Sequence, residues 1–87
     1  MDHDEELNKR EKLITSEELK KIGAKLTRLR KERGYTNSDS FSYDNNINRS
    51  QYGKYEAGSE DMRISSLVKV LNIYGLTLED FFGKDYT

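Results

Sequence analysis

The side chains best suited to chemistry lie near the middle of the chain, in a short polar segment. Lys54 follows Gln51 by three residues and Ser50 by four, so a helix would bring these three side chains to one face. Lysine suits the acceptor pair of guanine, and glutamine suits the acceptor and donor pair of adenine. Tyr52 and Tyr55 point to the other side, where their spacing predicts burial in the core, although aromatic rings beside cations can also stack on single-stranded bases. The segment is therefore equipped to hydrogen-bond to base edges.

Catalysis and metal binding find no support in the residue types. The chain has no cysteine and one histidine, His3, which lies in an acidic stretch at the start of the sequence. No glycine-rich phosphate loop occurs, and the neighbouring carboxylates Glu79 and Asp80 suit the first turn of a helix, where negative charge is favourable. We therefore expect no enzyme, no metal site and no cofactor.

The formal net charge of −1 hides a segregated pattern. Residues 1–19 hold seven acids and three bases, residues 20–54 hold nine bases and three acids, and residues 55–87 hold six acids and three bases. The net charges of the three segments are therefore −4, +6 and −3. A basic centre is typical of a surface that faces phosphates, because local charge density sets the field at a polyanion, but it also fits an ordinary solvated helix face.

Five helices are predicted, without strand-like alternation, so the expected fold class is all-α. The first helix should start at Thr15 and Ser16, bury a stripe of leucine and isoleucine residues at steps of three and four, and end before Gly34. Further helices are expected at about 37–44, 49–57 and 64–74, with a capped final turn at 77–82. The predicted organisation is an acidic, flexible extension at 1–14, a folded domain at 15–83 and a tail at 84–87.

Several short segments follow one another in an order that a known protein family shares. They are Ile22-Gly23, the run from Leu29 to Tyr35, Phe41-Ser42, the run from Ile47 to Gly58, the run from Ser66 to Leu71 and the run from Gly75 to Phe82. On these residues the chain resembles the phage repressor and Cro family, the XRE-type helix-turn-helix regulators, which implies a lambda-repressor-like fold of five helices. The chain departs from the family by one extra residue between Gly34 and Ser42 and by lacking the usual glutamine there, so the second helix is expected to begin differently.

The resemblance gives individual residues a role. It makes the helix at 49–57 the recognition helix that enters the major groove. The expected base-reading residues are Arg49, Ser50, Gln51 and Lys54. Arg49 could instead hold a phosphate. The expected phosphate-positioning residues are Thr36, Asn37, Asn48, Lys20, Lys25 and Arg28. For the first three the alternative is simple helix capping, and for the last three it is a solvated helix face.

Two further positions bear on how the recognition helix is held. The resemblance implies a structural ion pair between Arg30 and Glu56, which would join the first and third helices, and losing one buried partner would cost about 3 kcal/mol. Gly53 lies in the middle of the third helix, where glycine costs about 1 kcal/mol relative to alanine. A close approach by the second helix or by DNA would explain it.

The function expected from these features is sequence-specific binding of double-stranded DNA by a transcriptional regulator of the repressor type. A homodimer on a two-fold operator is expected because one recognition helix covers only a half-site. No apolar run reaches the ~20 residues of a membrane span, so a cytoplasmic, nucleoid-associated protein is expected. The alternative is an antitoxin or adaptor that uses the same fold to bind a protein partner, with residues 1–14 folding on that partner.

Overall fold

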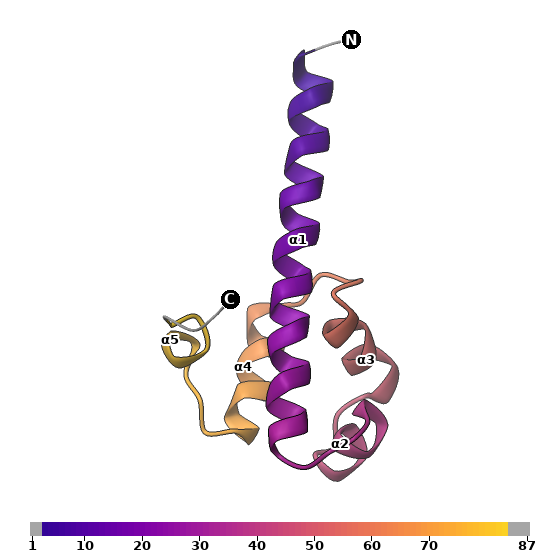
Figure 1. Cartoon of the computed structure of the whole chain (residues 1–87), viewed down its shortest axis with the longest axis vertical. Helices are drawn as coiled ribbons and strands as arrows, with labels where there is room; N and C mark the ends of the chain where they lie inside the picture. Colours follow the sequence, from indigo (N-terminus) through magenta and orange to yellow (C-terminus); the bar gives the residue numbers. More distant parts are fainter. Residues whose placement is uncertain (1–2, 84–87) are drawn as a thin grey trace.

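The computed structural model describes residues 3–83, with side chains at 9–11 and 14–83. This part of the chain is all-helical, as predicted, and folds into five helices (Figure 1). The helices are α1 (His3–Glu32), α2 (Ser38–Asp44), α3 (Arg49–Ala57), α4 (Ile64–Ile73) and α5 (Leu78–Phe81). None of them combines the length and the apolar character needed to span a bilayer.

The first helix starts much earlier than the sequence signals predicted. It begins at His3 and passes through Thr15 and Ser16 without a break, so the predicted helix start at these two residues is wrong. No glycine or proline occurs before Gly23, and the good helix formers around the two hydroxyl residues outweigh their preference for capping. The boundary placed between residues 14 and 15 is therefore not a break in the helix, whereas the flexibility expected of residues 1–14 stays a prediction.

The core lies between the second half of α1 and the other four helices. Its buried hydrophobic residues are Leu26, Phe41, Tyr52, Tyr55, Leu67, Val70, Leu71 and Phe81. Phe41 forms the centre of an aromatic group, with ring centroids 5.1 Å from Tyr52 and 5.6 Å from the parallel ring of Tyr74. The predicted burial of Tyr52 and Tyr55 is confirmed, which leaves the polar side of α3 to face outward.

Gly23 allows α1 and α3 to approach closely. A Cβ atom at this position would meet the carbonyl oxygen of Glu56 and lie 2.6 Å from that of Tyr55. These neighbours are backbone atoms and cannot swing aside as a long side chain would. The absence of a side chain at Gly23 therefore allows the end of α3 to pack directly against the backbone of α1.

Candidate nucleic-acid interface

The outer face of α3 presents every residue that was predicted to read bases. Arg49, Ser50, Gln51 and Lys54 are all exposed, whereas the two tyrosines of the same helix are buried. A short helix whose inner side chains are locked in a core can hold its outer side chains on a rigid support. The chemistry available on this face is hydrogen bonding from one guanidinium, one ammonium, one amide and one hydroxyl group.

Two asparagines begin the helices of this region as caps. The side-chain oxygen of Asn48 accepts a hydrogen bond from the backbone N–H of Gln51 at 2.9 Å, and Asn37 does the same for Ser40 at 2.8 Å. The capping interpretation of both residues is therefore confirmed. Thr36 is exposed in the turn before Asn37, and phosphate contacts by any of the three remain a prediction.

A buried ion pair clamps the end of α3 to α1. Arg30 donates from Nε to Oε2 of Glu56 at 2.8 Å and from Nη2 to Oε1 at 2.9 Å, and both side chains are more than nine-tenths buried. Thr27 donates to the same carboxylate at 3.0 Å, and Nη1 of Arg30 donates to the carbonyl of Tyr35 at 2.9 Å. The hydrogen bond to Glu56 raises the pKa of Arg30 above its usual value. The ion pair expected from the sequence is thus present. Through its bond to Tyr35, Arg30 also holds the turn after α1.

Lys25 is not available for phosphate, contrary to its predicted role. Its side chain is buried, and Nζ donates to the backbone carbonyl of Phe81 at 2.8 Å. The ammonium also lies 5.2 Å from the centroid of the Phe81 ring, within the range of a cation–π interaction. Lys25 therefore anchors α5 to α1, a role that charge patterning alone does not reveal.

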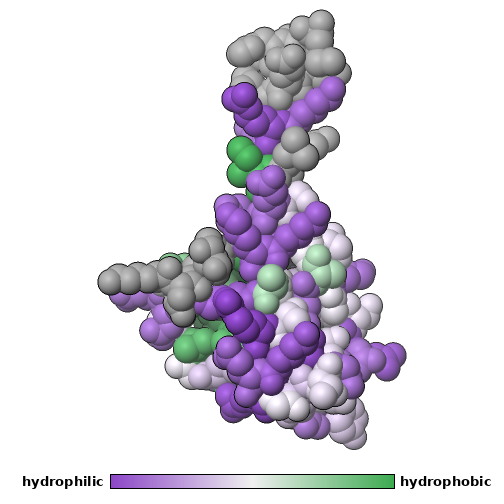
Figure 2. Space-filling view, in the orientation of Figure 1, coloured by the Kyte–Doolittle hydropathy of each residue, from purple (hydrophilic) through white to green (hydrophobic). Residues whose placement is uncertain are grey.

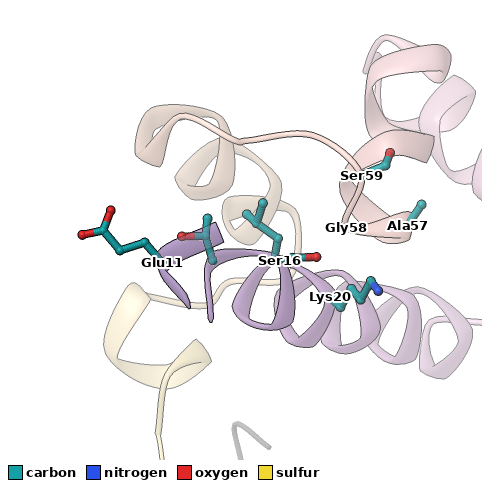
Figure 3. Close-up of a pocket in the computed structure, with 8 residues that line it drawn as sticks. Glu11, Ser16, Lys20, Ala57, Gly58 and Ser59 are labelled. Atoms are coloured by element: carbon teal, nitrogen blue, oxygen red, sulfur yellow. The ribbon is translucent and has the colours of Figure 1, made fainter. Parts of the chain in front are cut away.

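The other two basic candidates of α1 are exposed. The backbone of Lys20 packs against Gly58, whose left-handed conformation, with φ of 66°, ends α3. Beside this contact lies a groove of about 540 Å³, with Ser16 and Lys20 on one wall and Ala57 to Ser59 on the other (Figure 3). Glu11 extends away from the middle of the groove at its outer end. The sequence did not predict this groove, because α1 was expected to begin only at Ser16.

A second hollow, also missed from the sequence, lies beside the first turn of α3. It measures about 500 Å³ and is lined by Asp39, Ser40, Tyr43, Asp44, Ile47 and Arg49. Nη1 of Arg49 lies 4.0 Å from Oδ2 of Asp39, with side chains 74% and 65% exposed. Exposed pairs of this kind contribute only about 0–1 kcal/mol, so Arg49 can leave Asp39 at little cost. Tyr43 is 87% exposed and offers an aromatic ring next to the predicted reading residues.

Gly53 has no structural explanation within the described part of the chain. Apart from its chain neighbours and the nearby backbone of α3 itself, no atom there lies within 4 Å of a Cβ built on this residue, so α2 does not approach it closely. One of the two explanations considered from the sequence is thereby removed. Gly53 leaves the outer face of α3 flat between Arg49, Ser50 and Lys54.

The acidic side chains that the structure describes form no metal site. No three acidic or histidine side chains at 9–11 and 14–83 come together in an arrangement that could hold a metal ion. Comparisons of the chain with protein-family models, with curated proteins and with solved structures found no match.

Proposed function

We propose that this chain is a sequence-specific regulator of transcription that binds double-stranded DNA by inserting α3 into the major groove. The observation that carries the proposal is the outer face of α3, where Arg49, Ser50, Gln51 and Lys54 are exposed together on a helix held by buried tyrosines. The major groove admits one α-helix, and side chains on such a face can meet base edges there. The resemblance to XRE-type regulators, drawn from the residues of the chain, supports the same choice of helix.

Three of these side chains suit different groups on the DNA. Gln51 suits adenine, to which it can both donate and accept, and Lys54 suits the acceptors of guanine. Arg49 serves a guanine or a phosphate once it leaves Asp39. Each well-made contact to a base contributes about 1–3 kcal/mol of discrimination.

Binding to the phosphate backbone supplies the part of the affinity that does not depend on sequence. Arg49 and Lys54 are exposed cations within α3 itself that can make such contacts. Each phosphate that is neutralised adds about 0.9 to the slope of log affinity against log salt concentration. A two-fold operator bound by a homodimer would double both kinds of contact, and the protein would then be found on the nucleoid.

Selection from randomised duplex DNA tests this function. The purified full-length chain is expected to enrich a two-fold motif, and a variant with Gln51→Ala and Lys54→Ala should lose most of its preference for that motif. Lys69→Ala is the matched control, because Lys69 is an exposed lysine on α4. Absence of an enriched motif, or equal loss in the control, would refute the proposal.

A protein-binding module, such as an antitoxin or adaptor, is the second candidate. The first half of α1 extends beyond the other helices, and Ile14 on this extension is 54% exposed (Figure 1). A helix gains most of its stability from packing of an apolar face, and a protein partner could supply that packing around Ile14. A complex with a basic protein that survives loss of DNA binding but is broken by Ile14→Glu would favour this candidate.

A further inference from the structure

The side of α1 that faces away from the core carries an exposed stripe in which four of five residues are charged. Glu17, Lys20, Ala24, Arg28 and Lys31 follow one another at steps of three and four residues, and all five are exposed. The opposite stripe contains Leu26, which is fully buried in the core. Figure 2 shows mostly hydrophilic residues where α1 passes the other helices, on the face turned to the viewer. The stripe is therefore a long helical surface that no described part of the single chain covers.

The length of α1 makes this surface large. The helix has 30 residues, and at about 1.5 Å per residue it is ~45 Å long. The described molecule measures 50 × 29 × 22 Å, so α1 runs along most of its longest dimension. The packing against α3 is seen at Lys20 and Gly23, within the second half of the helix. Among the side chains described in the first half, Glu11, Ile14, Thr15 and Glu17 are exposed and so gain little of the tertiary packing that normally stabilises a helix in water.

The two halves of α1 carry opposite charges. Residues 3–19 hold six acids and three bases, a net charge of −3. Residues 20–32 hold six bases and one acid, of which two bases, Lys25 and Arg30, are buried and held by hydrogen bonds. The exposed remainder, four bases and Glu32, has a net charge of +3. A second α1 in the opposite direction would place each acidic half against a basic half.

We propose that a second copy of this chain binds along the outer stripe of α1, so that the two α1 helices pack antiparallel in a homodimer. In one register, Glu17 of each copy lies opposite Lys20 of the other, so the symmetric dimer contains this pair of opposite charges twice. By spacing in the sequence, the same register pairs position 24 with the leucine at position 13 and position 31 with the glutamate at position 6. It also brings Lys9 toward Arg28 of the second copy, a like-charge approach that limits the affinity. The folded bodies lie on the outer sides of the helix pair, because the core of each chain is opposite its stripe.

This inference extends the proposed function by naming the dimer surface, but its test does not require DNA. Lys20 and Arg28 would contact the second copy rather than phosphates. Lys20→Glu should then weaken DNA binding only as far as it weakens the dimer. The two proposals can therefore fail separately.

The mass of the full-length chain in solution, measured by sedimentation equilibrium over a range of protein and salt concentrations, tests the dimer. The wild type is expected to dimerise at low salt and to dissociate as salt rises, because the pairing is between exposed charges. Glu17→Lys and Lys20→Glu should each raise the dimer Kd by about tenfold, since the symmetric dimer contains the pair twice. The variant with both changes should return to within about threefold of the wild type.

Helicity of each variant, followed by circular dichroism, shows that the chain remains folded. Lys69→Glu on α4 makes the same charge change away from the stripe and should leave the dimer Kd unchanged. A chain that stays monomeric under all conditions would overturn the proposal. So would a dimer that ignores the single changes, or one that the double change fails to restore.

Discussion

Two helical glycines should respond in opposite ways to the same substitution. At Gly53 an added Cβ would meet no described atom within 4 Å beyond its chain neighbours and the nearby backbone of its own helix, so Gly53→Ala should gain the helix propensity of alanine, about 1 kcal/mol. At Gly23 the added Cβ would lie 2.6 Å from the carbonyl oxygen of Tyr55 and closer still to that of Glu56. The same gain in propensity is there opposed by overpacking against backbone, typically about 1–3 kcal/mol and more where nothing can yield. We therefore expect Gly23→Ala to lose about 2 kcal/mol, which separates the two variants by about 3 kcal/mol.

Urea unfolding followed by far-ultraviolet circular dichroism measures both changes against the wild type. With similar m-values, the midpoint should rise for Gly53→Ala and fall for Gly23→Ala. A Gly23→Ala protein as stable as the wild type would mean that α1 and α3 do not pack as described. A destabilised Gly53→Ala protein would mean that the fold itself requires Gly53. The glycine would then not be explained by a flat outer face of α3 that approaches DNA.

Three further predictions concern the ion pair that holds α3, the lysine that anchors α5 and the buried hydroxyl group of Tyr74. Arg30→Met should cost about 3 kcal/mol in urea unfolding because it strands the carboxylate of Glu56, and adding Glu56→Leu should recover much of that loss. Lys25→Met should cost about 1–3 kcal/mol by removing the buried hydrogen bond from Lys25 to the carbonyl of Phe81, yet leave the DNA affinity of the folded protein unchanged in titrations. Burial raises the pKa of Tyr74 from 10.0 to about 12, so the neutral form is favoured in the folded chain. Stability from this group is present below pH 10 and is lost as pH rises to about 12, and Tyr74→Phe should flatten that loss in pH-dependent unfolding.

Local signals in the sequence predicted the end of α1 and the positions of the four shorter helices. Asn48 and Asn37 start helices as caps, and Gly58 ends α3 in the left-handed conformation, because these effects act over one turn of chain. The start of α1 was missed for a related reason. Thr15 is a good cap in isolation, but its preference is smaller than the combined propensity of the residues on either side.

The site was predictable where it depends on one helix and not where it depends on contacts across the fold. The alternation of Tyr52 and Tyr55 with polar residues identified the outer face of α3. Lys25 looked like another exposed base, because only the packing of α5 shows that its ammonium binds a carbonyl. The approach of Asp39 to Arg49 joins two helices across a turn, and no spacing rule within one helix predicts such a pair.

An altered-specificity selection tests the reading role of α3 most directly. Gln51→Arg replaces a side chain suited to adenine with one suited to guanine, at an exposed position where the change should not disturb the core. Selection of randomised duplex DNA with this variant and with the wild type should give motifs that differ at one position in each half-site, with adenine replaced by guanine. Identical motifs from two folded proteins would contradict base reading by Gln51 and, with it, the proposed placement of α3 in the major groove.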